Sequence, residues 1–195
     1  MNQRRTLAAL LLASLATPAL AHTGVGATAG LYHGLAHPLG GLDHLLAMLA
    51  VGLWAAQQGG RALWAVPGAF VGMLLVGGLL ALAGIPLPLV EPGIVGSVIL
   101  FGVLIASATR LPTAAGMAIV GVFALFHGHA HGSELPESVS ALTYAIGFVV
   151  ATATLHAVGA GAALLGQRWL APKLLRLGGG VIAAAGVALA SGLVS

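Results

Sequence analysis

The sequence contains no cysteine and little charge, and each absence excludes a group of functions. Without cysteine the chain forms no disulfide, thiolate metal site, iron–sulfur cluster or cysteine nucleophile. Only 6% of the 195 residues are charged, whereas about a quarter are charged in a typical soluble domain. Seven basic and four acidic side chains give a net charge of +3 with no basic cluster, which excludes nucleic acid as a partner. The sequence also lacks the P-loop that would bind ATP.

Apolar residues, in contrast, make up 59% of the chain, and the mean hydropathy is +1.06. Such a chain has too little polar surface to cover a globule in water. It also contains 30 glycines, and small residues allow transmembrane helices to approach one another closely. The composition therefore predicts a membrane protein surrounded by the lipid bilayer.

Six apolar segments after residue 21 have about the length of a membrane span, for which a helix needs roughly 20 residues. The segments are continuously apolar and lack the alternation of barrel strands. The predicted fold is therefore all-α, a polytopic membrane helix bundle of about six transmembrane helices. The predicted spans are Leu42–Gln58, Ala62–Ala83, Gly93–Thr109, Thr113–His129, Ser138–Leu165 and Leu175–Val194.

The first 21 residues are typical of a secretory signal peptide. Two arginines precede an apolar run, and an A-x-A cleavage site stands at residues 19–21. The predicted organisation is a signal peptide at 1–21 and a single transmembrane domain at 22–195, with an uncleaved first helix as the alternative. Cleavage makes His22 the first mature residue, and its imidazole and free α-amine then form a candidate metal-binding pair.

Charges in the predicted loops orient the bundle. The acidic residues Glu91, Glu134 and Glu137 follow the second and fourth spans, and Glu91 and Glu137 are interpreted as loop charges. The basic residues beyond the signal all follow the first, third and fifth spans, at Arg61, Arg110, Arg168, Lys173 and Arg176. By the positive-inside rule this basic side is cytoplasmic, so both mature termini are predicted to be periplasmic in a bacterial inner membrane.

Two histidine-rich motifs then fall on the same, outer membrane face. Residues 37–44 read His-Pro-Leu-Gly-Gly-Leu-Asp-His at the entrance of the first span. Residues 126–134 read Phe-His-Gly-His-Ala-His-Gly-Ser-Glu at the exit of the fourth span. Imidazole suits nickel, cobalt, copper and zinc, and a carboxylate adds an oxygen ligand and negative charge. The pattern predicts a site for a divalent transition metal between these two spans.

The spacing within the second motif makes a geometric prediction. His127 and His131 are separated by four residues, so a helix presents both on one face. His129 points roughly the opposite way if the helix continues. Alternatively, Gly128 and Gly132 loosen the turn and all three histidines converge.

The first motif predicts a break in the helix. Pro38 and the pair Gly40-Gly41 interrupt helix geometry just before Asp43, and irregular backbone in a membrane is tolerated where it lines a cavity. An uncompensated carboxylate in a span costs about 2.5 to 3.5 kcal/mol. Asp43 is therefore expected to have a partner.

Two further histidines each have two interpretations. His33, four residues before His37, is either an interfacial residue or a metal ligand. His156 lies well inside the fifth predicted span, where it is either an interhelical hydrogen-bond donor or a ligand that receives the ion further inward.

At this point the motifs resemble the two signatures of the HupE/UreJ family. The patterns His-Pro-x-x-Gly-x-Asp-His at 37–44 and Phe-His-Gly-x-Ala-His-Gly-x-Glu at 126–134 match at every fixed position. The signal and six spans resemble the family's layout along nearly the whole chain. The resemblance implies a nickel permease, in some members a cobalt permease, of the bacterial inner membrane that serves hydrogenase or urease maturation, with metallochaperones of that maturation as partners.

The resemblance also implies which residues function. His129 occupies a variable position and inherits no role, so it rests on local chemistry, as do His22, His33 and His156. The family's fixed polar positions are His37, Asp43, His44, His127, His131 and Glu134. The expected ion is Ni²⁺ or Co²⁺, carried as a substrate, although zinc shares these ligands.

Two other functions use the same ligands. A metal sensor or accessory membrane protein binds the ion without carrying it. An intramembrane metalloenzyme uses the cluster to activate water or oxygen, but the bundle offers no further acid or base, because the remaining carboxylates are in loops. The prediction is therefore a transporter and not an enzyme, without catalytic residues or a bound catalytic cofactor.

Overall fold

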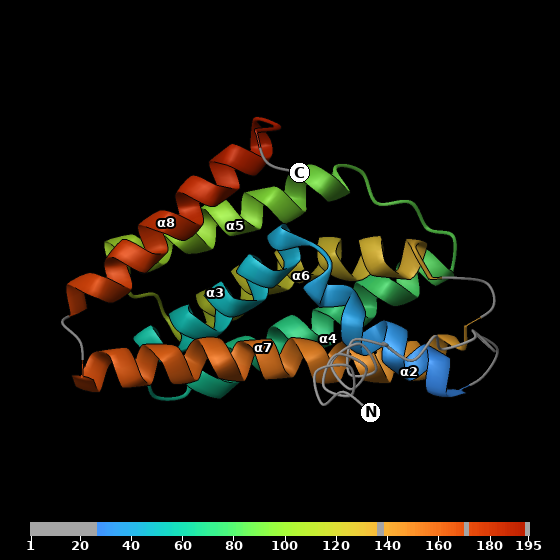
Figure 1. Ribbon diagram of the computed structural model, residues 1–195, viewed down its shortest axis with the longest axis horizontal. Helices are drawn as coiled ribbons and strands as arrows, with labels where there is room; N and C mark the ends of the chain where they lie inside the picture. The colour runs from blue at the N-terminus through green and yellow to red at the C-terminus, as the bar shows by residue number, and fades with distance from the viewer. Residues whose placement is uncertain (1–26, 136–138, 170–171, 194–195) are drawn as a thin grey trace, which may run out of the picture.

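The computed structural model describes residues 27–135, 139–169 and 172–193, and every regular element within these ranges is helical (Figure 1). The all-α prediction is confirmed. The predicted signal peptide at 1–21, His22 and Glu137 lie outside the described residues. The elements are α2 (Ala27–Ala36), the 3-10 turn η1 (His37–Leu39), α3 (Leu42–Gln58), α4 (Ala62–Leu82), α5 (Val90–Ser107), α6 (Thr113–Ser133), α7 (Ala141–Trp169) and α8 (Pro172–Ala190).

The helices have the length and composition of a multi-pass membrane protein. In α4, α5, α6, α7 and α8 the apolar stretch is long enough to cross a bilayer. The 17 residues of α3 make a sixth span when they are joined to α2 and η1, with a bend of 81° between the two parts. Large apolar side chains such as Leu79, Leu142 and Val181 are more than half exposed on the outside of the bundle, as lipid contact requires.

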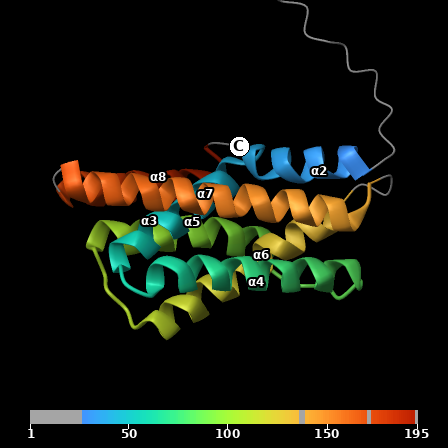
Figure 2. The same cartoon turned by 90° about the horizontal axis from the view of Figure 1, so that it is seen from below.

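The centre of the bundle is α3, which contacts α4, α5, α7 and α8. Around it, α5 pairs with α8, and α4 pairs with α6 (Figure 1). Viewed at 90°, α2 and α7 lie on one side of the bundle and α4 and α6 on the other, with α3 between them (Figure 2). The apolar residues of α3 are accordingly the most deeply buried, with Met48, Val51 and Trp54 fully enclosed.

Glycines set how closely the helices approach. A Cβ at Gly128 of α6 would overlap the backbone carbonyl of Leu74 in α4. Similarly, a Cβ at Gly52 of α3 would overlap the backbone carbonyl of His156 in α7. Small residues at these crossings allow backbone-to-backbone packing, and such van der Waals contact is one of the forces that associate helices in lipid.

The segment before α3 contains both a confirmed prediction and an unexpected helix. The predicted interruption is present, because Pro38 lies in a 3-10 turn and Gly41 has extended backbone angles (φ −110°, ψ 125°) directly before α3. The sequence did not predict α2, whose ten residues are too few to span a bilayer alone. It packs along the start of α7, where a Cβ at Gly34 would meet the backbone of Tyr144.

Hydrogen bonds hold the opposite end of the bundle together near the basic residues. The indole of Trp54 and the amide of Gln58 both donate to the carbonyl of Thr109, at 3.3 and 2.6 Å. Arg110 donates to the carbonyl of Gln58, and Arg176 donates to that of Ala106 at 2.8 Å. The basic loops therefore lie at the end of the bundle away from the histidine motifs.

Candidate metal centre

A cleft of about 510 Å³ opens at the histidine end of the bundle. It lies where the bend before α3 faces the start of α5 and the end of α6. Its polar lining consists of His33, His37, Asp43, His44, Glu91, His131 and Glu134. Both sequence motifs, far apart along the chain, thus contribute to one cavity.

The outermost group joins the two motifs directly. His37 Nε2 donates a hydrogen bond to Glu134 Oε2 at 2.9 Å, and His131 Nδ1 lies 3.9 Å from the same oxygen. One candidate ligand atom from each of these three residues lies within 4.8 Å of the other two. Ligand atoms about 2.1 Å from a common ion are at most about 4.2 Å apart, so a shift of less than about 1 Å would allow all three to bind one ion.

Asp43 has the expected partner, and the partner is its own neighbour. His44 Nδ1 donates to Asp43 Oδ1 at 2.9 Å, and the backbone N–H of His44 donates to the same oxygen at 2.8 Å. The Asp43 side chain is 20% exposed, so it also remains in contact with the cleft. The pair leaves His44 Nε2 buried without a hydrogen-bond partner among the described residues.

From the cleft, imidazoles continue into the bundle. The ring centroid of His131 lies 4.7 Å from that of His37 and 4.3 Å from that of His44. His44 in turn lies 4.9 Å from His127. The six signature residues therefore form one unbroken series of contacts.

Side-chain exposure is highest at the mouth of the cleft and lowest inside the bundle. The side chain of Glu134 is 55% exposed, that of His37 34%, that of His44 13% and that of His131 5%. His127 is fully buried. In the described part of the chain, both nitrogens of His131 and Nδ1 of His127 lack a hydrogen-bond partner. Buried imidazole nitrogens without partners are costly unless something binds them.

His156 lies beyond this series, deeper in the bundle. It is 3% exposed, and its ring meets the buried ring of Phe70 at a centroid distance of 5.0 Å. Phe70 also contacts His127, at 5.6 Å. Thr152, one helical turn before His156 on α7, is fully buried. Neither imidazole nitrogen of His156 nor the hydroxyl of Thr152 has a hydrogen-bond partner within the described ranges.

The two remaining described histidines lie apart from the series. Because α6 continues to Ser133, His129 points away, and its Nε2 donates to the carbonyl of Ile85 at 3.0 Å. Of the two alternatives for the second motif, the continuous helix is therefore the one observed. His33 is exposed on α2 and lines the cleft, with its ring beside Tyr32.

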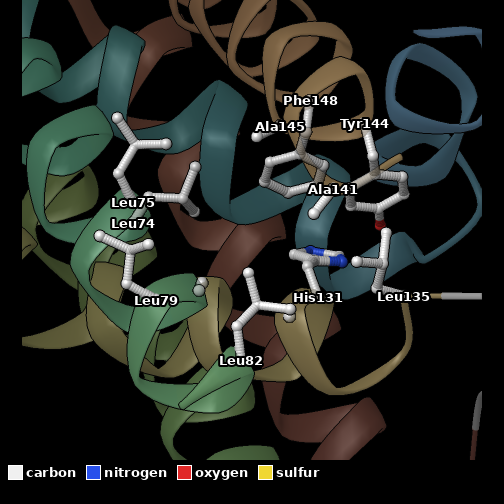
Figure 3. A pocket seen from close by; sticks show the side chains of 13 residues that line it. Leu74, Leu75, Leu79, Leu82, His131, Leu135, Ala141, Tyr144, Ala145 and Phe148 are labelled. Carbon is white, nitrogen blue, oxygen red and sulfur yellow. The ribbon is translucent and has the colours of Figure 1, made fainter. Parts of the chain in front are cut away.

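Apolar residues close the other side of His131. Its ring lies against Phe148 at a centroid distance of 4.1 Å and borders a small apolar pocket between α4, α6 and α7 (Figure 3). The leucines of α4 face it across this pocket, and Tyr144 of α7 lies beside it (Figure 3). His131 therefore lies between the polar cleft on one side and this apolar pocket on the other.

Sequence reasoning missed two polar residues of this region. The sequence predicts Glu91 as a loop charge, but it lies in the first turn of α5 and lines the cleft. Its position on the same predicted membrane face as the histidines was the available signal. Ser97 of α5 is fully buried and contacts His127 Nε2 at 3.0 Å. No motif marks Ser97, because its partner is thirty residues away.

Comparison with known proteins identifies the family of this chain. The family model described as HupE / UreJ protein matches residues 9–189, a range that includes both motifs and every described helix up to Leu189. The chain belongs to the HupE/UreJ family. It is 47% identical over 182 residues to Protein HupE of Rhizobium leguminosarum bv. viciae, covering 93% of this chain and 95% of that protein. No solved structure matches the chain significantly.

Proposed function

We propose that this HupE/UreJ protein carries a divalent transition-metal ion inward across the bacterial inner membrane, nickel first and cobalt next. One observation carries the proposal. Six polar residues from two motifs form a continuous series of contacts, and their exposure falls from an open cleft to a fully buried imidazole. A surface that only bound metal would not need to extend into the bundle in this way.

The residues suit a stepwise exchange of water for protein ligands. Glu91 and Glu134 place negative charge at the mouth of the cleft, where a hydrated cation would first arrive. His37, His131 and Glu134 then replace part of its hydration shell. His44 and His127 continue the series, and His156 provides imidazole nitrogens further inward. Nitrogen and carboxylate donors without thiolate are typical of nickel, cobalt and zinc sites.

Orientation supports inward movement. The histidine end and the basic end lie at opposite ends of the bundle, and the positive-inside rule assigns the basic end to the cytoplasm. The cleft then opens to the periplasm. A membrane potential of about 100 mV, negative inside, favours entry of a divalent cation by about 4.6 kcal/mol. Uptake on this scheme requires no ATP.

Radiolabelled nickel uptake in cells tests the proposal. His44→Ala removes a cleft imidazole, and Asp43→Asn removes the negative charge that orients it, so both should lower uptake by at least about tenfold at equal protein levels in the membrane. Excess unlabelled cobalt should compete with nickel, whereas magnesium, which prefers oxygen ligands, should not. Near-normal uptake by both variants would rule out this site.

A further inference from the structure

Ser97 of α5 has an unusual pair of contacts for a hydroxyl in an apolar helix. It is fully buried, and its Oγ lies 2.6 Å from the carbonyl oxygen of Ile94, three residues earlier. Serines in apolar helices commonly donate back to such a carbonyl. The same Oγ, however, also lies 3.0 Å from Nε2 of His127 on the neighbouring helix α6. Because the hydroxyl proton is used in the first contact, the second contact can be a hydrogen bond only if His127 supplies the proton.

Counting protons fixes the state of the imidazole. A serine hydroxyl has a single hydrogen, and the carbonyl of Ile94 can only accept. That hydrogen must lie between Ser97 and Ile94, because two oxygens 2.6 Å apart without a proton would repel. The contact with His127 is then a hydrogen bond only if Nε2–H donates to the serine oxygen. Neutral His127 therefore carries its proton on Nε2 and a lone pair on Nδ1.

Nδ1 is then the nitrogen of His127 that remains available to an ion. Nδ1 of His127 is buried and has no hydrogen-bond partner among the described residues. The nearest imidazole is that of His44, whose Nδ1–H donates to Asp43 and whose Nε2 is likewise buried and unpartnered. The two rings thus present opposite nitrogens, Nε2 from α3 and Nδ1 from α6.

We propose that Ser97 is a positioning residue for the metal route: it holds His127 in the Nε2–H form, so that Nδ1 is the atom that binds the passing ion. This inference rests on the proposed function and deepens it. Ligand histidines in metal sites usually donate their second N–H to an oxygen that fixes the ring and its tautomer. Ser97 has this role for His127, and Asp43 has it for His44.

The test is equilibrium nickel binding to the purified full-length protein in lipid nanodiscs. Ser97→Ala removes the acceptor of Nε2–H and should weaken nickel affinity by about 10- to 100-fold. Ser107→Ala is the matched control, because Ser107 is on the same helix and also donates to a carbonyl, that of Val103 at 2.7 Å, but it contacts no histidine. Its nickel affinity should equal that of the wild type.

A second readout observes the tautomer of His127 directly in the wild-type protein. Nitrogen NMR of histidine-labelled wild-type protein without metal, at pH 8 so that imidazoles are neutral, distinguishes the protonated from the bare ring nitrogen. The His127 signal is identified by its absence from the spectrum of His127→Gln. In the wild type it should show a protonated Nε2 and an unprotonated Nδ1. In Ser97→Ala the two forms should mix, which a merely structural serine would not cause.

The outcomes separate this inference from the proposed function. If the wild type binds nickel and Ser97→Ala binds it equally well, or if His127 carries its proton on Nδ1, Ser97 is not a positioning residue while the transport proposal stands. If the wild type binds no nickel at all, the proposed function fails and the inference fails with it. Weaker binding in Ser97→Ala together with a mixed His127 signal supports the inference.

Discussion

The two histidine motifs line one cleft, but one lies in a broken helix and the other in a continuous helix. Residues 37–44 do so across a broken helix, in which a 3-10 turn and an extended glycine bend the chain by 81°. Residues 126–134 do so at the end of α6, which remains helical to Ser133. In the continuous helix only His127 and His131, one turn apart, face the site, and His129 points elsewhere.

The difference shows what each backbone provides. A regular helix offers the site every fourth residue and places those side chains one turn apart, here His131 with a 5% exposed side chain and the fully buried His127. The bend allows His37 and the neighbours Asp43 and His44 to line the same cleft, although their spacing would not place all three on one face of a regular helix. The second motif thus provides imidazoles at different depths in the bundle, and the first provides a carboxylate paired with an imidazole at a single depth.

The largest expected effect comes from disturbing the continuous helix at its packing face. Gly128→Ala places a Cβ against the backbone of Leu74 and should force α6 away from α4, which costs about 1–3 kcal/mol when a packed core is overfilled. We expect a lower thermal unfolding midpoint in detergent and loss of nickel uptake together. The midpoint is measured by loss of helical circular dichroism.

Gly72→Ala is the control for this change. Gly72 lies on α4, close in sequence to Leu74, and a Cβ there meets nothing within 4 Å. Alanine also favours a helix over glycine by about 1 kcal/mol, so Gly72→Ala should not lower the midpoint. An unchanged midpoint in Gly128→Ala would show that α4 and α6 do not pack as described.

A smaller effect is expected from the bend. In Gly41→Ala the new Cβ would lie 2.8 Å from Asp43 Oδ1 and 3.1 Å from His44 Nδ1, so the pair must shift. The backbone angles of Gly41 suit alanine, so the helix break should persist. Nickel affinity should fall by about tenfold with little change in stability, measured by isothermal titration of the purified protein.

Gly40→Ala serves as the neighbouring control. Its Cβ would meet only the carbonyl oxygen of His37, at 3.3 Å, and would not touch the Asp43 side chain. Nickel affinity should therefore stay near the wild-type value. Equal losses in Gly40→Ala and Gly41→Ala would mean that the bend itself, rather than the Asp43–His44 pair, determines affinity.

The smallest effect is expected from the histidine that faces away. His129→Ala loses one hydrogen bond to the carbonyl of Ile85, worth about 1 kcal/mol of stability. Nickel uptake at matched protein levels should be unchanged. A loss of uptake comparable to that of His44→Ala would contradict the continuous-helix geometry and return His129 to the site.

Features encoded locally were predictable from the sequence. The apolar segments marked α3 to α8 within a few residues, and Pro38 with Gly40 and Gly41 marked the break before α3. The spacing of His127 and His131 placed both on one face of α6. The ends differ by up to four residues; the sequence predicts that the fourth span ends at His129, for example, whereas α6 continues to Ser133.

Features that depend on packing between helices could not be predicted. Gly128 and Gly132 were candidates for loosening the turn, but their lack of side chains serves close packing against α4. Ser97 contacts His127 only because α5 packs against α6 at this point. Glu91 lines the cleft only because α5 begins beside the cleft. No local sequence pattern encodes such contacts between helices.

The most direct test of the central claim is nickel entry into proteoliposomes that contain only this protein, with an imposed potential negative inside. The account predicts that nickel accumulates in the lumen of wild-type vesicles and remains at the level of protein-free vesicles with His44→Ala. Nickel that binds the wild-type protein without reaching the lumen would contradict transport and indicate a sensor or accessory protein.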